Sequence, residues 1–449
     1  MTWHVITRVG SSDDYDAGLY ESEPRIAVGI ARPGDRWEIN NNALPTIFER
    51  TGRFPSAPAI DLLHLAFSVY SADLQIPRSQ FQDAWTRELI LHLPVSDPDR
   101  WTELTPLLSR LLMFLTGDVW EIRPRKIGAF EPPKPERPKP PTIQRAVERV
   151  ALFSGGLDSL VGAIDFLEKG ETVALAGHYG AGMTNGFQQR VLGSLRTTYG
   201  ERAAEFMFYA QPPKHKREGE ASMRSRSLLF LSLGISVASA LGAGQPLTVS
   251  ENGLISLNVP LTNPRTGSLS TRTTHPHFLR LFRELLTGLE LRHEIQTPYR
   301  FQTKGEMVTN ASNTTVLAEA AKLSMSCSHT EAGRYQGRTP GNHCGYCVPC
   351  IIRRAAMNAA GLEDAPYDID VLTSPPDATT ETGADLRAFQ MALERFVDAR
   401  FDDSLFRVLA TGPLPPEDAA GYAAVYSRGM VELGNILMPE RFNKKTDIC

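Results

Sequence analysis

Hydrophobic and polar positions alternate with two different periods in the middle of this 449-residue chain. Short apolar runs typical of buried strands begin at Arg149 (RVALFS), Thr172 (TVALAGHYG) and Glu205 (EFMFYA). Between them, SLVGAIDFLEKG and GFQQRVLGSLRTTYG carry apolar residues at helical spacing. Strands that alternate with helices are joined by right-handed crossovers and form a parallel sheet. The pattern therefore predicts an α/β domain over residues 148–325.

The first 128 residues show strand and helix patterns in a less regular order. The strand-like runs are RIAVGIA, RWEIN, LILHLPV and DVWEIRP, and helical spacing appears over residues 57–74 and 101–115. We expect a small α+β domain over residues 1–128. Its tryptophans are expected in the core and its Arg/Asp pairs on the solvated surface, with no catalytic role.

A proline-rich stretch follows, with six prolines between Pro132 and Pro141. Proline has no N–H to give to a helix or an inner strand, so residues 129–147 are predicted to form an extended linker. Near the other end, ADLRAFQMALERFV and DAAGYAAVYSRGMVELGNIL have helical spacing. They predict a mainly helical C-terminal extension over residues 362–449.

Residues 227–250 contain no charge, but serine, glycine and proline interrupt them. We expect a buried helix, a glycine turn and the strand LTVS there, rather than a membrane span. The start of the chain lacks the apolar core of a signal peptide, which favours a cytoplasmic protein without a membrane partner. The formal net charge of −4 argues against DNA held on a basic surface.

The strongest local signal is SGGLDS, which ends the first predicted strand of the α/β domain and opens a helix. Backbone N–H groups at such a helix start favour a bound anion, and Gly155 and Gly156 permit its close approach. Ser154 and Ser159 add hydroxyl donors. Asp158 would repel phosphate unless Mg²⁺ bridges the two. The motif matches neither the Walker loop nor the dinucleotide-binding loop, since no lysine follows the glycines and no G-x-G is present.

Two other stretches carry cations suited to the same anion. SMRSRSLLFLSLG places Arg224 and Arg226 at the start of an apolar helix, where arginine can bind phosphate with two parallel hydrogen bonds. TPYRFQTKGEMV places Lys304 in a turn before another helix. Each cation alone is ordinary at a helix start. Together with the glycine loop, they predict phosphate contacts for Arg226 and Lys304.

Four of the five cysteines form a tight group with the spacing Cys327-x16-Cys344-x2-Cys347-x2-Cys350. Four thiolates suit a tetrahedral Zn²⁺ with a closed, structural coordination shell, which predicts a metal site in residues 326–361. The spacing also allows an iron–sulfur cluster. His329 and His343 lie nearby and are expected to be bystanders.

These features in combination resemble the 7-cyano-7-deazaguanine synthase (QueC) family of PP-loop ATP pyrophosphatases, over about residues 149–361. The resemblance implies a PP-loop fold that binds ATP, a structural zinc, and adenylation of 7-carboxy-7-deazaguanine with release of pyrophosphate. It assigns the pyrophosphate loop to Ser154, Gly155, Gly156, Leu157, Asp158 and Ser159. It assigns catalytic phosphate and metal contacts to Asp158, Arg226 and Lys304, and zinc to Cys327, Cys344, Cys347 and Cys350.

The chain departs from the compact biosynthetic enzymes in its added terminal regions and in its substrate segment, residues 250–279. This build resembles the QueC-like proteins of bacterial anti-phage operons, the QatC type, some of which are thought to attach a deazaguanine to a protein. A protein acceptor and other proteins of the operon are therefore expected partners. Candidate substrate-side residues are Glu251, Asn252 and Arg265. His275 and His277 are either a proton shuttle or plain helix-start residues.

Three interpretations stay open at this point. The first is an AMP-forming carbon–nitrogen ligase that acts on a deazaguanine-type carboxylate. The second is a tRNA-modifying PP-loop enzyme with an iron–sulfur cluster on the same cysteines. The third is a nucleotide-binding scaffold of a defence complex that lacks catalysis.

Overall fold

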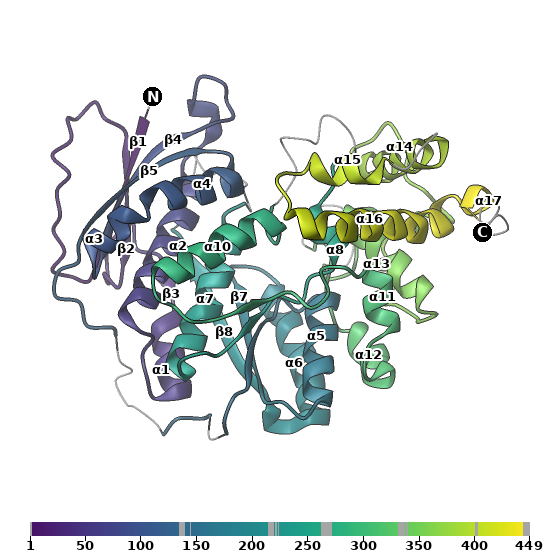
Figure 1. The fold of residues 1–449 in the computed structure, drawn as a ribbon, viewed down its shortest axis with the longest axis horizontal. Helices are drawn as coiled ribbons and strands as arrows, with labels where there is room; N and C mark the ends of the chain where they lie inside the picture. Colours follow the sequence, from purple (N-terminus) through teal and green to yellow (C-terminus); the bar gives the residue numbers. More distant parts are fainter. Residues whose placement is uncertain are drawn as a thin grey trace.

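A computed structural model describes residues 2–133, 140–143, 145–213, 220, 222, 224–261, 272–330, 337, 340–399 and 403–442. Its centre is a six-stranded sheet, of which β3, β7 and β8 are labelled in Figure 1. The strand order is β10-β9-β6-β7-β8-β3. The strands are β3 (Asn40–Asn41), β6 (Arg149–Leu152), β7 (Val173–Tyr179), β8 (Ala203–Gln211), β9 (Leu247–Thr248) and β10 (Ile295–Gln296). All neighbouring pairs are parallel except β3 with β8. The predicted parallel sheet is therefore confirmed.

The helices between these strands cover both faces of the sheet. They are α5 (Leu157–Glu168), α6 (Thr184–Tyr199), the 3₁₀ turn η2 (Gly200–Arg202), α7 (Arg226–Leu241), α8 (Gly253–Leu257) and α10 (Pro276–Gly288). Successive strand residues serve opposite cores, as the pleat requires. Val150 belongs to the cluster that contains α7 and α10, whereas Ala151 belongs to the cluster that contains α5 and α6.

The N-terminal region holds a second sheet, in the order β2-β1-β4-β5. Its elements are β1 (Thr2–Val9), β2 (Arg25–Ile30), α1 (Ala43–Thr51), α2 (Ala57–Gln75), the 3₁₀ turn η1 (Arg78–Gln80), β4 (Glu88–Val95), α3 (Pro98–Glu103), α4 (Thr105–Thr116) and β5 (Val119–Lys126). All four strands run parallel; a loop joins β1 to β2, and helices lie in the connections from β2 to β4 and from β4 to β5. The α+β prediction is therefore wrong, because helices cross over between parallel strands here too.

Two details of that region differ from the sequence pattern. The strand β1 was not predicted, although it lies in the middle of its sheet. The run RWEIN forms no strand of the N-terminal sheet beyond one bridge between Gly29 and Glu38. Instead, Asn40 and Asn41 pair with the end of β8 and join the central sheet.

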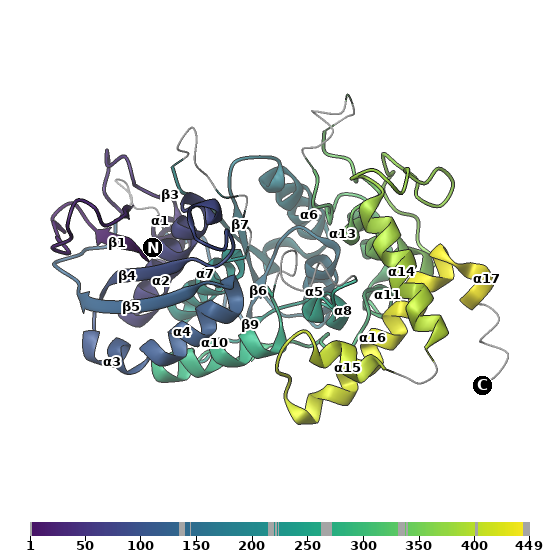
Figure 2. The ribbon, with the colours of Figure 1, turned by 90° about the horizontal axis from the view of Figure 1, so that it is seen from above.

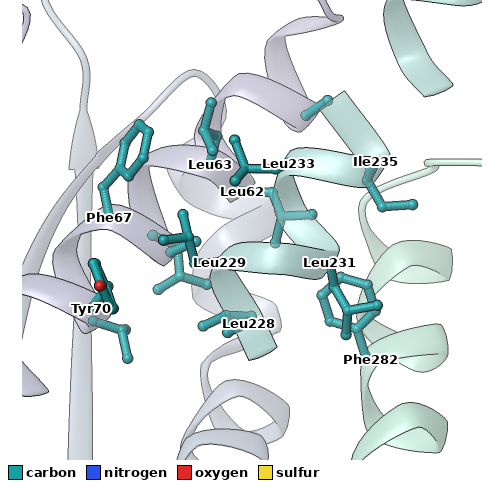
Figure 3. Close-up of a cluster of buried hydrophobic side chains, with 14 of the residues drawn as sticks. Leu62, Leu63, Phe67, Tyr70, Leu228, Leu229, Leu231, Leu233, Ile235 and Phe282 are labelled. Carbon is teal, nitrogen blue, oxygen red and sulfur yellow. The ribbon is translucent and has the colours of Figure 1, made fainter. Parts of the chain in front are cut away.

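Helix α2 packs along α7, so the hydrophobic core does not stop at the proline-rich stretch (Figure 3). Leu62, Leu63 and Phe67 of α2 lie against Leu229 and Leu233 of α7 in one buried cluster. Each of these side chains is at most 1% exposed. The N-terminal region thus covers the α7 face of the central sheet.

The C-terminal part contains the helices α11 (Lys304–Thr309), α12 (Thr314–Ala321), α13 (Val348–Ala359), α14 (Ala384–Asp398), α15 (Ser404–Leu409), α16 (Pro416–Leu437) and α17 (Pro439–Phe442). The buried side chains of α11 and α12 belong to the cluster that contains α5 and α6. Helices α13 to α17 form a third cluster around the cysteine segment. Seen from above, the N-terminal sheet and helices α14–α17 lie at opposite ends of the molecule (Figure 2). No helix in the described part of the chain has the length and apolar character needed to cross a bilayer.

Candidate functional site

The order of the central strands marks one place where a ligand crevice forms. From β6 the chain moves to β7 and β8 on one side, whereas β9 and β10 lie on the other. The carboxyl ends of β6 and β9 therefore flank a topological switch point, where open α/β sheets bind ligands. The segment SGGLDS follows β6, and Ser250, Glu251 and Asn252 follow β9.

The glycine loop forms a tight turn into α5. Gly155 has a φ of +79°, in the left-handed region, and a Cβ there would lie 3.1 Å from the Gln188 side chain. The Gly155 carbonyl accepts a hydrogen bond from the Met325 N–H at 2.9 Å. Gly156 is the N-cap of α5 and supplies no capping side chain. The first N–H groups of α5 are consequently left for an external acceptor.

The two serines of the loop lie beside these N–H groups. Ser154 Oγ is 3.3 Å from Ser159 Oγ and accepts from the Gly156 N–H at 3.2 Å. The Ser159 hydroxyl donates to the Gly156 carbonyl at 2.9 Å. Both side chains line the same cavity as the loop backbone.

Asp158 is buried in the first turn of α5 and is bonded on both oxygens. Its Oδ1 is paired with Lys304 Nζ, and its Oδ2 accepts from Asn252 Nδ2 at 2.7 Å. Burial opposes ionisation, but the Lys304 charge and the hydrogen bonds outweigh it and lower the pKa of Asp158. Asn252 was predicted to contact the substrate, whereas in the structure its side chain is hydrogen-bonded to Asp158.

Glu251 lies next to Asp158 and completes a pair of carboxyl groups in the crevice. Burial, followed by the nearby Asp158 charge, raises the pKa of Glu251 well above its usual value. Two carboxyl groups share one ammonium here. A divalent cation would relieve their mutual repulsion.

Arg226 begins α7 and also lines the crevice. Its Nη2 donates to the His178 carbonyl at 3.4 Å, and its guanidinium lies 5.9 Å from the Phe230 ring. Burial lowers the pKa of Arg226, yet a guanidinium stays charged in proteins. In the described part of the chain, no carboxylate forms an ion pair with Arg226, so its charge is available to an anionic ligand.

These groups surround one cavity of about 380 Å³. Its lining includes Ser154, Gly156, Asp158, Ser159, Arg226, Glu251 and Lys304. Thr273, Thr274, Met325 and Ser326 also line it, and the sequence analysis had not singled them out. A second cavity of about 580 Å³ shares Ile255 and Pro349 with the first.

The remaining candidates lie elsewhere or outside the described residues. His275 is the N-cap of α10, and its Nε2 is 2.9 Å from Thr411 Oγ1. Neither His275 nor His277 lines the cavity, so the helix-start interpretation holds and the proton shuttle gains no support. The Arg224 guanidinium stacks over the Trp85 ring at 4.6 Å, and Arg224 does not line the cavity. Arg265 lies outside the described residues.

The four cysteine sulfurs converge as predicted, all within 4.8 Å of one another. The Cys327–Cys347 and Cys344–Cys350 sulfur pairs are each 3.9 Å apart. A tetrahedron with metal–sulfur bonds of about 2.3 Å has edges of about 3.8 Å. The four thiols therefore fit a single tetrahedral ion such as zinc.

The spacing of the sulfurs also bears on the iron–sulfur alternative. A cluster of several irons binds each cysteine to a different corner, which holds the sulfurs further apart than one shared ion does. The N–H groups of His329 and Cys344 lie 3.2 and 3.4 Å from Cys327 Sγ, as suits a thiolate ligand. His343 and His329 are not needed to complete the set of four sulfurs.

No protein-family model matches this chain, and no curated protein is significantly similar to it.

Proposed function

We propose that this protein is an ATP-dependent, AMP-forming ligase that adenylates a carboxylate and passes the acyl group to an amine. The substrate class is a deazaguanine-type acid, 7-carboxy-7-deazaguanine or a relative. The observation that carries the proposal is the convergence of SGGLDS, Arg226 and Lys304 on one cavity at the switch point of a parallel sheet.

The cavity offers an ordered set of donors to a triphosphate. The free N–H groups at the start of α5 and the hydroxyls of Ser154 and Ser159 would hold the pyrophosphate end. Arg226 would bind phosphate oxygens with its planar fork. Lys304 would move its charge from Asp158 to the phosphates when the nucleotide is bound.

Mg²⁺ fits the same place by its donor chemistry. Asp158 and Glu251 present carboxyl oxygens, the ligands that Mg²⁺ prefers, beside the loop expected to hold the phosphates. Bound there, Mg²⁺ would neutralise both the carboxylates and the polyphosphate. Burial and the Asp158 charge raise the pKa of Glu251, and a bound Mg²⁺ would offset both effects.

The reaction needs neutralisation of charge more than a protein base. A carboxylate oxygen of the substrate attacks the α-phosphorus, and the bond to the β-phosphate oxygen breaks to release pyrophosphate. Arg226, Lys304 and the loop N–H groups would stabilise the negative charge that gathers on the leaving group. An amine then attacks the acyl carbon, which forms an amide and releases AMP.

Zinc is the metal that we assign to the four cysteines. With four thiolates and no open position, it would brace the segment that carries Met325 and Ser326 to the cavity wall rather than act on substrate. Zinc measured at one ion per chain on a colourless protein would support this assignment. A brown protein that contains iron would support the tRNA-modifying alternative instead.

The decisive experiment is to incubate the protein with MgATP, 7-carboxy-7-deazaguanine and an amine. AMP and pyrophosphate should form together, and only when the carboxylate is present. ADP as the only nucleotide product would refute the mechanism. ATP binding without turnover, even with operon partners added, would favour the scaffold alternative. Mass spectrometry of co-expressed partner proteins, in search of an added deazaguanine-sized mass, would test a role in protein modification for anti-phage defence.

A further inference from the structure

Both terminal regions reach the helices that carry the two cations of the cavity. Helix α7 starts with Arg226, and helix α11 starts with Lys304. Each helix start contacts a carboxylate from a part of the chain far away in sequence. On the N-terminal side this carboxylate is Asp73 of α2, which accepts from the Ser225 N–H, and on the C-terminal side it is Glu432 of α16, which accepts from the Gly305 N–H.

Asp73 holds the residues just before Arg226. Its Oδ2 accepts from the Ser225 N–H at 3.1 Å, the Ser225 hydroxyl at 2.8 Å and the Ser222 hydroxyl at 2.9 Å. Its Oδ1 accepts from Arg87 Nη2 at 2.7 Å. Burial opposes ionisation, but Arg87 and the Ser225 bonds outweigh it and lower the pKa of Asp73. A fixed negative charge thus lies at the positive end of α7, where it favours the helix dipole.

Hydrophobic packing between α2 and α7 fixes the position of Asp73. The apolar face of α2 lies along α7 over several turns, and Tyr70 of α2 lies near the start of α7 (Figure 3). Asp73, one turn after Tyr70, is fully buried. The N-terminal region therefore bonds the residue immediately before Arg226.

Glu432 holds the start of α11 in a comparable way. It accepts from the Thr303 hydroxyl at 2.7 Å and from the Gly305 N–H at 3.1 Å, so its bonds flank Lys304 on both sides. A Cβ on residue 305 would lie 2.3 Å from Glu432 Oε2, so only glycine permits this approach. Arg428, one turn earlier on α16, donates to the Phe301 carbonyl at 2.7 Å and reinforces the same contact.

We propose that the two added regions position the nucleotide-binding cations: α2 sets Arg226 through Asp73, Ser222 and Ser225, and α16 sets Lys304 through Glu432. This inference rests on the proposed function. Asp73, Ser222, Ser225 and Glu432 are positioning residues, because none of them lines the cavity. Small displacements of such cations weaken binding strongly, since phosphate recognition depends on geometry.

The test compares the dissociation constant for MgATP, measured by calorimetry, across matched variants. The double variant Ser222→Ala/Ser225→Ala and the variant Glu432→Ala should each raise it about tenfold. Two controls remove similar bonds that do not reach the cation-bearing turns. Ser239→Ala removes a hydroxyl contact between α7 and Ser56 at the far end of the helix. Asp418→Asn removes the 3.8 Å pair between α16 and Arg300. Both controls should bind MgATP like the wild type.

A positioning role also predicts non-additivity. The serine variants should have no further effect in an Arg226→Ala background, and Glu432→Ala none in a Lys304→Ala background. Ser225→Thr and Glu432→Gln keep an oxygen in place and should largely restore affinity. If the double serine variant does not fold, Ser225→Ala alone takes its place, because it keeps the N–H bond to Asp73. Its dissociation constant for MgATP is then measured with Arg226 present and with Arg226→Ala.

Unchanged affinity in the serine and Glu432 variants, or equal losses in the presence and absence of the cations, would overturn the inference while the proposed function stands. Wild-type protein that does not bind MgATP, or binds it without Arg226, would overturn the proposed function as well. The two failures are therefore distinguishable.

Discussion

Buried charges gather in two places in this molecule, and the two groups differ in what they leave unsatisfied. The first, here called the quartet, consists of Asp73, Arg78, Arg87 and Asp118 in the N-terminal region. The second, here called the crevice cluster, consists of Asp158, Arg226, Glu251 and Lys304. Both contain two carboxyl groups and two cations.

In the quartet, every charged side chain is paired with an opposite charge. Asp118 accepts from Arg78 Nη1 at 2.7 Å, from Arg87 Nη2 at 2.6 Å and from the Arg87 N–H at 3.1 Å. None of the four residues lines a cavity described above. The expectation of solvated Arg/Asp pairs is wrong for this group, because each charge is buried against an opposite one.

In the crevice cluster, by contrast, the charges are not all paired. Lys304 is paired, but Arg226 has no carboxylate partner in the described part of the chain, and the pKa of Glu251 is raised by burial and by Asp158. A cavity of about 380 Å³ lies against all four groups. Burial of charge alone therefore does not indicate a site. Unmatched charge beside a cavity does.

The largest expected effect is on the quartet. Asp118→Asn places an amide donor against two guanidinium groups and leaves charge unpaired, which should lower the free energy of unfolding by about 3–5 kcal/mol. Denaturant titration measures it. The exposed Asp99→Asn on α3 is the control and should stay within about 0.5 kcal/mol of wild type. A fully stable Asp118→Asn protein would show that the quartet does not depend on its charge.

The same Asp→Asn substitution at Asp158 in the crevice should affect activity more than stability. Asp158→Asn should reduce AMP formation roughly 10²- to 10³-fold, because charge organisation at the phosphates is lost. Its stability should change less than that of Asp118→Asn, since Glu251 remains to pair with Lys304. Turnover and denaturant unfolding, measured on both variants, test the expected loss of activity and the expected difference in stability. Turnover near the wild-type rate would remove Asp158 from the reaction.

Acid should destabilise the protein through its buried histidines, and His64 of the N-terminal region is one of them. His64 is fully buried, its ring nitrogens have no hydrogen-bond partner among the described residues, and burial lowers its pKa from 6.5 to about 3. The unfolded chain therefore binds a proton between these pH values and the folded one does not, so stability falls as the pH drops below 6.5. At pH 4.5 protonation of His64 in the unfolded chain should lower the free energy of unfolding by roughly 2–3 kcal/mol, and His64→Leu should not show this loss.

Unfolding titrations at pH 7 and pH 4.5 for both proteins measure the difference. Equal pH dependence in the two would mean that His64 is protonated in the folded state.

The smallest expected effect refines the role of Arg226. Arg226→Lys keeps the positive charge but loses the planar fork, so the dissociation constant for MgATP should rise about tenfold, or about 1.4 kcal/mol. Calorimetry measures it, and Arg224→Lys, at the neighbouring arginine stacked on Trp85, is the matched control. Equal affinity of Arg226→Lys and wild type would indicate a contact by charge alone.

Some features of the protein were determined by the sequence itself, because they are local. The strand–loop–helix around SGGLDS depends on consecutive residues, and the cysteine hooks Cys344, Cys347 and Cys350 lie within one turn and the following helix. The alternation of strand and helix periods also predicted the parallel central sheet. Residue spacing along the chain was enough for each of these.

Only the tertiary structure decided which distant groups meet. Ser225 and Asp73 are 152 residues apart, and Gly305 and Glu432 are 127 apart, yet each pair shares a hydrogen bond. Likewise, β3 leaves the N-terminal region to pair with β8, and the Arg and Asp residues that looked solvated are buried together. No local pattern encodes these contacts, because they depend on how α2 and α16 pack on the central domain.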